Sequence, residues 1–351
     1  MKTKKIKPLP DVGEMSKSKM EKFLRCPFSY DQHYNKRVRP CKVGSALIFG
    51  IGIDSGLNEM LAASKTDPVK AFRDSIEQFP LGKMTVGRYD YDKDLLTDKD
   101  KETALTYCKS LGYKGDDPDG LFKELMEKEK LSKKQEQAVD YLARVSFAAK
   151  ARILFDAYKK QIMPRIKKVL AIQKSVGAGI LDLVAVWDDD KTYVIDNKTA
   201  TNEYEQDEAD YSVQLTSYAI EEKIDNTMFI VLPKRIDKDF VKTCKTCGHK
   251  ASSSHQTCNA ETDGKRCGGE WSVKIKFSVQ IQVVTGEVTE LMKKRTKEIQ
   301  KQVRDMTNTG NFPCNFANCG NMFGKPCEYR DLYWKGKMDG LEEVKGSGKK
   351  K

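Results

Sequence analysis

The chain has 351 residues and carries 63 Lys and Arg against 51 Asp and Glu, which gives a formal net charge of +12. That length can bury a large core and hold roughly two or three modules. The longest apolar stretches are far shorter than a bilayer span, so we expect a cytoplasmic protein and no membrane segment. The basic balance suits a polyanionic partner, most commonly nucleic acid, although a soluble lysine-rich surface has the same balance.

The first predicted element is a helix that ends at Cys26-Pro27, because proline cannot continue a helix. Met20, Phe23 and Leu24 recur on one face of this helix and are expected to be buried. Taken by itself, Cys26 is interpreted as a small buried hydrophobic residue.

A glycine-rich apolar helix is predicted next, over residues 43–63. Its glycines each cost up to about 1 kcal/mol in a helix interior, so we expect close packing against another backbone. Asp54 interrupts the apolar pattern, and it either faces solvent or belongs to a site. The residues expected to face the core are Leu47, Ile48, Ile51, Leu57 and Leu61.

Residues 66–163 are charged and mostly helical in pattern, with apolar residues at helical spacing in the segment 131–158. This region is predicted to be a helical insertion beside the core. Its lysines either help to hold DNA or form a solvated face. Cys41 and Cys108 have no cysteine nearby in the sequence and are interpreted as ordinary thiols.

A β-hairpin is predicted in residues 177–199, after a strand over residues 169–176. Two apolar runs, 180–187 and 192–195, surround the polar turn 188–190. The first run is nearly continuous, which is typical of a strand covered on both faces.

Two carboxylates interrupt this apolar hairpin. If it closes symmetrically about Asp189, Asp182 lies across from Asp196 with Cβ atoms about 5 Å apart, where like charges repel. Lys198 then points to the same side as Asp196. Carboxylates in an apolar setting need a cation between them, and Mg²⁺ or Mn²⁺ takes oxygen ligands of this kind. The alternative is that one or both carboxylates lie at a strand end and face water.

A helix over residues 207–223 follows, and a strand over residues 227–232 then returns to the sheet. Gln214 and Tyr218 are four residues apart and therefore share one helix face. From spacing alone, they are either site residues or a core tyrosine with a glutamine at its edge.

Ten cysteines in a reducing compartment favour metal binding over disulfides. The segment 237–271 contains Cys244-x₂-Cys247-Gly, then Cys258 and Cys267-Gly-Gly, and four thiolates suit tetrahedral Zn²⁺. The second pair is irregularly spaced, so His249 or His255 could replace one of its cysteines. A zinc ribbon inserted between core strands is predicted, and whether it contacts DNA or only stabilises itself stays open.

An alternating strand is predicted over residues 272–284, followed by a lysine-rich helix over residues 287–306. The loop after this helix contains Cys314, Cys319 and Cys327, one thiolate short of a closed four-cysteine site. The tail 335–351 is polar and is predicted to be disordered.

The hairpin carboxylates, the triplet Asp196-Asn197-Lys198 and the Gln214-x₃-Tyr218 spacing together resemble the RecB-like branch of the PD-(D/E)xK nucleases. In that branch a metal-binding histidine follows a Phe-Gly pair. Here Asp54 stands at that position, which is similar to phage-encoded members.

The cysteines resemble the iron–sulfur subset of that branch, which includes CRISPR-associated nucleases. There, one cysteine precedes the nuclease core and three follow it, and together they hold a [4Fe–4S] cluster. The corresponding residues here are Cys26, Cys314, Cys319 and Cys327. Their spacing is wider than the common one, so zinc or no metal stays open for this set.

The resemblance implies an α/β, restriction-endonuclease-like core, with a central mixed sheet flanked by helices. It implies metal-dependent hydrolysis of DNA, most simply by an exonuclease acting on single-stranded or duplex ends in recombination, repair or phage DNA metabolism, with replication or recombination proteins as further partners. Lys198 would orient the attacking water, and Gln214 and Tyr218 would line the DNA-facing side. The implied Mg²⁺ or Mn²⁺ ligands are Asp54, Asp182, Asp196 and the backbone carbonyl of Asn197.

Two other functions stay open on the sequence: a non-catalytic DNA-binding or assembly protein on a nuclease fold, and a zinc-ribbon adaptor in a replication or repair complex. The predicted segments are 1–65 (N-terminal helices of the core), 66–168 (helical insertion), 169–236 (catalytic sheet and Gln/Tyr helix), 237–271 (zinc ribbon), 272–306 (core strand and helix), 307–334 (cysteine cluster) and 335–351 (basic tail).

Overall fold

The computed structural model describes residues 17–177, 179–251, 257–262, 265–310, 312–315 and 327–344. Its centre is a five-stranded mixed sheet in the order β13-β7-β6-β5-β4, in which β6 and β7 run parallel and the other neighbours antiparallel. The central mixed sheet expected from the sequence is therefore confirmed. Its strands are β4 (Ile166–Val176), β5 (Gly179–Trp187), β6 (Thr192–Ala200), β7 (Asn226–Pro233) and β13 (Gln282–Glu287).

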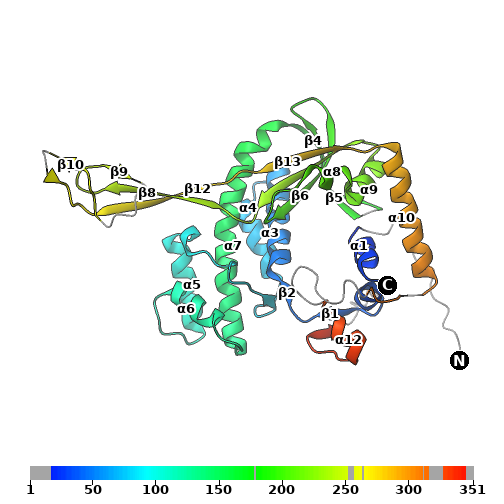
Figure 1. Ribbon diagram of the computed structural model, residues 1–351, viewed down its shortest axis with the longest axis horizontal. Coiled ribbons are helices and arrows are strands. Elements are labelled where there is room, and N and C mark those ends of the chain that lie inside the picture. The colour runs from blue at the N-terminus through cyan, green and yellow to red at the C-terminus, as the bar shows by residue number, and fades with distance from the viewer. Residues whose placement is uncertain are drawn as a thin grey trace.

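Helices cover both faces of this sheet (Figure 1). On one face, Leu183 and Ala185 of β5 pack in a single core cluster with residues of α3 (Ser45–Leu61), α4 (Pro68–Glu77) and α7 (Lys133–Gln161). On the other face, Val184 and Val194 pack against Tyr218. Burial on both faces explains why the first apolar run of the hairpin is nearly continuous. The helices of this second side are α8 (Gln206–Asp210), α9 (Val213–Glu222) and α10 (Glu290–Asn308), so the single helix predicted over 207–223 is in fact two.

Helix α3 is packed differently from the prediction. Leu47 is 59% exposed and Ile51 is 37% exposed, whereas Ile48, Leu57 and Leu61 are buried as expected. The physical reason lies in the glycines: a Cβ at position 52 would fall 2.6 Å from the Phe72 ring, and one at position 56 would clash with Phe155. The glycine face therefore receives large aromatic rings from α4 and α7, and the opposite face of α3 stays open.

The insertion is smaller than the predicted segment 66–168, because α4 and α7 share the main core. Only α5 (Asp98–Ser110) and α6 (Pro118–Met126) form a separate cluster against one end of α7, with Cys108 buried inside it. The short elements of this region are β2 (Val43–Gly44), β3 (Met84–Thr85) and the 3₁₀ turns η3 (Lys93–Leu95) and η4 (Met163–Arg165). No helix in the described ranges is both long and apolar enough to cross a bilayer.

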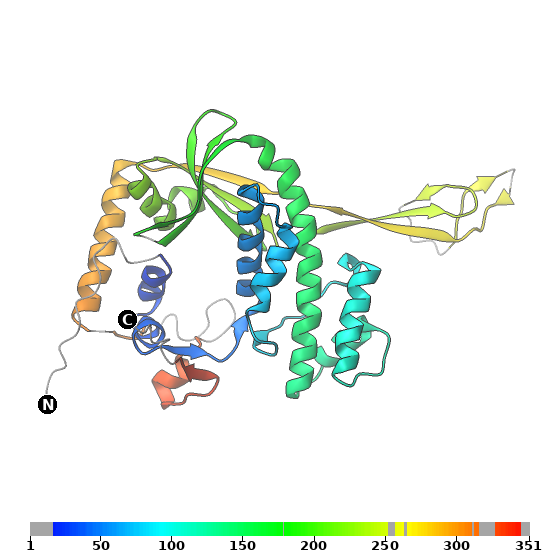
Figure 2. The same cartoon turned by 180° about the vertical axis from the view of Figure 1, so that it is seen from behind.

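A two-stranded arm projects far from the core (Figures 1 and 2). It is built from β8 (Asp237–Cys244) and β12 (Trp271–Ser278), which pair over eight residues. In the sequence the arm is inserted between β7 and β13, which are neighbours in the core sheet. The strand predicted over 272–284 is therefore two strands, one in the arm and one in the sheet. The outer end of the arm holds β9 (Lys250–Ala251), β10 (Glu261–Thr262) and β11 (Lys265–Arg266).

Segments from the two ends of the described chain meet beside α10 (Figure 2). Helix α1 (Lys17–Arg25) packs Met20 and Phe23 against Val303 of α10, but Leu24 is exposed, contrary to the prediction. The remaining elements here are α2 (Pro27–Tyr30), the π-helix η2 (Asp31–Asn35), β1 (Val38–Pro40), α12 (Arg330–Lys335) and β14 (Leu341–Glu343). Because β14 pairs with β1, the start of the tail predicted to be disordered is in fact ordered; residues 345–351 lie outside the described residues.

Candidate functional site

The hairpin closes in the predicted register. Leu183 pairs with Ile195 and Val186 with Thr192, so the pairing is symmetric about Asp189 and its next position sets Asp182 opposite Asp196. Beyond the pair formed by Leu183 and Ile195, the backbone N–H of Asn197 donates a hydrogen bond of 2.9 Å to Asp182 Oδ2. The strand pairing itself therefore holds one oxygen of Asp182 in a fixed position beside the end of β6.

Asp196 is the most buried carboxylate of this site, with 1% of its surface exposed. Its Oδ2 lies 2.5 Å from Lys198 Nζ in an ion pair that offsets its charge. The carboxylates of Asp182 and Asp54 interact with the same ammonium, and a hard cation bound to these oxygens would offset the negative charge that a single ammonium leaves. The residues present therefore fit the divalent metal ion that the sequence implies.

The charges of the site act on one another. Burial, followed by the nearby carboxylates of Asp196 and Asp54, raises the pKa of Asp182 to about 8. Burial and the Asp196 carboxylate likewise raise the pKa of Asp54. Burial alone would lower the pKa of Lys198, but the attraction of Asp196 and Asp182 outweighs it and the pKa is raised, so the ammonium stays charged.

Asp54 reaches the site from the open face of α3. Its Oδ1 accepts a hydrogen bond of 3.1 Å from Gln173 Nε2, on β4. A Cβ at position 50 would lie 3.6 Å from Thr199 Oγ1, so this part of α3 lies directly against β6. The carboxylate oxygens of Asp54, Asp182 and Asp196 are not all within 4.8 Å of one another. Within the described part of the chain, only one set of three or more potential metal ligands is that close, and it consists of cysteines in the arm. The three carboxylates are nevertheless close enough to interact electrostatically.

Gln214 and Tyr218 are placed behind the lysine. Lys198 Nζ donates to Gln214 Oε1 at 3.1 Å, Gln214 Nε2 donates to the Tyr218 hydroxyl at 3.2 Å, and that hydroxyl donates to the carbonyl of Ile180 at 2.8 Å. Gln214 is 8% exposed and Tyr218 is 3% exposed. Both side chains are buried, and Gln214 contacts the Lys198 ammonium directly; their role in lining the DNA-facing side stays a prediction.

Sequence reasoning missed two residues that touch the site. Gln173 contacts Asp54, and the hydroxyl of Tyr158, a fully buried residue of α7, lies 3.3 Å from Asn197 Oδ1. Burial, then the charge of Asp182, raises the pKa of Tyr158, so the hydroxyl stays neutral. The sequence signal available for Tyr158 was its helical spacing, which predicts a core residue equally well.

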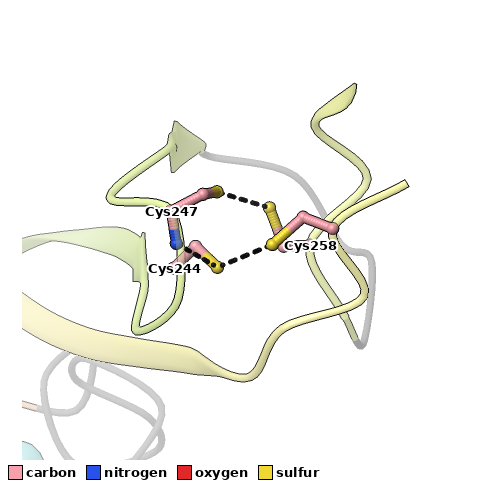
Figure 3. Close-up of side chains that lie close together, drawn as sticks. Cys244, Cys247 and Cys258 are labelled. Atoms are coloured by element: carbon pink, nitrogen blue, oxygen red, sulfur yellow. Dashed lines mark hydrogen bonds between the residues drawn. The ribbon is translucent and has the colours of Figure 1, made fainter. Parts of the chain in front are cut away.

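The ligand atoms that do come within 4.8 Å of one another belong to Cys244, Cys247, Cys258 and Cys267, at the outer end of the arm. Figure 3 labels the first three of these side chains. The Sγ atoms of Cys244 and Cys267 are 3.6 Å apart, and those of Cys247 and Cys258 are 3.7 Å apart. The backbone N–H groups of Cys247 and Thr246 point at Cys244 Sγ and lower the pKa of that thiol to about 6. This set could hold a metal ion as thiolates.

The histidine alternatives for this set differ in position. His249 is exposed, with its ring centroid 6.3 Å from that of Trp271, and is not a member of the group of close sulfur atoms. His255 lies outside the described residues. The close ligand atoms in the described residues are therefore those of the four cysteines, and a role for His255 stays a prediction.

The second cysteine set is only partly described. Cys26 and Cys314 are buried in one small cluster, and the N–H of Asn315 lies 3.5 Å from Cys26 Sγ. Cys327 packs in the adjoining cluster, and Phe28 borders both clusters. Cys319 lies outside the described residues, so the four-cysteine site stays a prediction. The structure does place Cys26 beside Cys314, although almost the whole chain separates them in the sequence.

A mixed sheet whose central hairpin holds Asp182, Asp196 and Lys198, with Asp54 from a covering helix, fits the core of a metal-dependent nuclease. The family model described as "PD-(D/E)XK nuclease superfamily" matches residues 14–332. The chain belongs to that superfamily, which implies metal-dependent nuclease activity with DNA as the substrate. No curated protein matches the sequence.

Proposed function

We propose that the protein is a Mg²⁺- or Mn²⁺-dependent deoxyribonuclease that hydrolyses phosphodiester bonds at DNA ends. The observation that carries this proposal is the buried Asp196 carboxylate paired with Lys198, with the Asp182 and Asp54 carboxylates close enough to interact with it electrostatically. The chemistry fits superfamily membership, whereas the choice of DNA ends rests on the resemblance to RecB-like nucleases.

Each residue of the site has a distinct task in this mechanism. Asp54, Asp182 and Asp196 would hold the ion, with the backbone carbonyl of Asn197 as a further ligand. When bound, the ion acts as a Lewis acid that lowers the pKa of a water molecule and offsets charge on the phosphate. Lys198 orients the attacking water and stabilises the developing negative charge, while Gln214 and Tyr218 hold its ammonium in place.

Digestion of linear and covalently closed DNA by protein supplied with Mn²⁺ tests both parts of the proposal. We expect linear DNA to be shortened from its ends and closed circles to survive, because an exonuclease needs a terminus. Nicking or linearisation of closed circles would contradict the exonuclease assignment and leave the nuclease assignment intact. A metal-replete protein that is inert on every form of DNA would instead favour a non-catalytic DNA-binding or assembly protein on a nuclease fold.

We also propose that the arm holds Zn²⁺ and that the set containing Cys26 and Cys314 holds a [4Fe–4S] cluster. Support for zinc comes from the four close sulfur atoms. Support for iron comes from the resemblance and from the two buried cysteines lying together. In both positions the metal would stabilise a peripheral segment and take no part in hydrolysis. If the protein instead acts as a zinc-ribbon adaptor, the arm would be the part that binds the partner, because it projects away from the sheet (Figure 1).

The zinc assignment predicts that Cys258→Ser removes about one zinc per chain and leaves the iron content and the cleavage of DNA ends unchanged. Replacing one thiolate opens a tetrahedral site, but the eight-residue ribbon separates this site from the sheet. Metal analysis of anaerobically purified protein, with its visible absorption spectrum, checks the content, and end digestion checks activity. Cys41→Ser, a cysteine outside both sets, is the control. An unchanged zinc content in Cys258→Ser would overturn the assignment.

A further inference from the structure

One residue in the catalytic sheet has an unusual backbone. Gln173 lies inside β4 with a φ of +47°, in the left-handed region that side chains other than glycine rarely adopt. The other four described non-glycine residues with positive φ lie outside the central strands, in turns or at the ends of elements: Arg37, Ala63, Asp190 and Lys223. A costly conformation inside a strand persists only where its surroundings enforce it, and such residues cluster at functional sites.

The strand register places Gln173 beside the candidate metal ligands. Ile172 pairs with Leu183 and Lys174 with Leu181, so Gln173 stands opposite Asp182. Its side-chain amide donates the 3.1 Å hydrogen bond to Asp54 Oδ1, which joins β4 to α3. The left-handed backbone therefore occurs at a strand position that is next to Asp182 and also contacts Asp54.

An amide donor suits this position chemically. Asn58 also interacts with Asp54, but it lies on the same helix and cannot fix that helix against the sheet. A neutral amide from the sheet orients Asp54 without adding a charge to the site. A lysine or arginine at the same place would bring a positive charge that opposes cation binding.

We propose that Gln173 is a positioning residue for the metal site: it holds the Asp54 carboxylate in the orientation that binds a divalent cation together with Asp182 and Asp196. The inference rests on the proposed function, since it presumes that these carboxylates bind the ion. Residues that orient a metal ligand through a hydrogen bond typically change metal affinity by about 10- to 100-fold when they are replaced.

Two substitutions separate the amide from the backbone. Gln173→Ala removes the amide and keeps a side chain at positive φ, whereas Gln173→Gly removes the amide and relieves the backbone. Both are expected to weaken Mn²⁺ binding to the isolated protein by about 10- to 100-fold. Gln173→Gly is expected to melt no lower than the wild type. Ala63→Gly relieves positive φ at the end of α3 without touching Asp54, and it should bind Mn²⁺ as the wild type does.

Mn²⁺ binding is measured by calorimetry, with Asp54→Ala defining the part of the signal that belongs to this site. The Mn²⁺ concentration for half-maximal cleavage should rise in both Gln173 variants, more than the rate at saturating Mn²⁺ falls. Wild-type affinity in Gln173→Gly would overturn the inference, because the amide would then be dispensable for metal binding. If the wild type binds Mn²⁺ and cuts DNA while the variants match it, only this inference fails; a wild type that does neither overturns the proposed function as well.

Discussion

Lys198→Ala and Asp196→Asn are each expected to reduce DNA cleavage by at least about 10³-fold while DNA binding is retained. Asp196 contributes the buried oxygen that fits a cation, and Lys198 Nζ lies 2.5 Å from it. Asparagine keeps the shape of the aspartate and removes its charge, so the loss would report ligand chemistry and not packing. Single-turnover digestion of end-labelled DNA measures the rate, and a gel-shift experiment without divalent metal measures binding.

Asp190→Asn is the matched control for these variants. It makes the same chemical change in the same hairpin, at an exposed turn residue with positive φ that asparagine also tolerates. Cleavage by Asp190→Asn should equal that of the wild type. Wild-type cleavage by Lys198→Ala and Asp196→Asn as well would refute the assignment of the active site.

The second large effect is expected in the pH dependence of stability. Asp182 has a pKa of about 8 in the folded protein and near 3.8 when unfolded, so between these values the folded state binds a proton that the unfolded state has released. Stability in the absence of divalent metal therefore falls as pH rises through this window, by up to about 1.4 kcal/mol per pH unit. Asp182→Asn cannot lose that proton, and its free energy of unfolding relative to the wild type should rise from pH 5 to pH 8.

Urea unfolding at several pH values, in buffer without Mg²⁺ or Mn²⁺, measures this difference. Asparagine can still accept the hydrogen bond from the N–H of Asn197, so the strand end is preserved. At pH 8, saturating Mg²⁺ should increase the free energy of unfolding of the wild type more than that of Asp182→Asn, because the metal ion takes the place of the proton on Asp182. Parallel pH curves for the two proteins would contradict the electrostatic account of the site.

The sequence predicted the hairpin well because strand pairing is a local property. Alternation of side chains and a polar turn fix which residues stand opposite one another, so Asp182, Asp196 and Lys198 could be brought together without coordinates. The Cys-x₂-Cys-Gly turn is local in the same way. Predicting that Cys258 and Cys267 join them required only that the inserted segment fold back on itself.

Contacts between distant segments could not be predicted in this way. The apolar run predicted as one strand over 272–284 divides between the arm and the sheet, because pairing with β8 and with β7 decides where each half lies. Likewise, the Gln214 and Tyr218 spacing predicts a shared helix face, but only packing against β5 and β6 decides that this face is buried.

The sequence by itself determined the superfamily, the hairpin that carries Asp182 and Asp196, and the residue types that could bind a divalent cation. The tertiary structure alone decided that Leu47 and Ile51 are exposed and that Asp54 lies against the sheet, where it accepts a hydrogen bond from Gln173. The physical reason is that the sequence of a helix which is apolar on nearly all sides does not predict which side will pack against the core. That choice depends on Phe72 and Phe155, rings from other helices that fill the space the glycines leave.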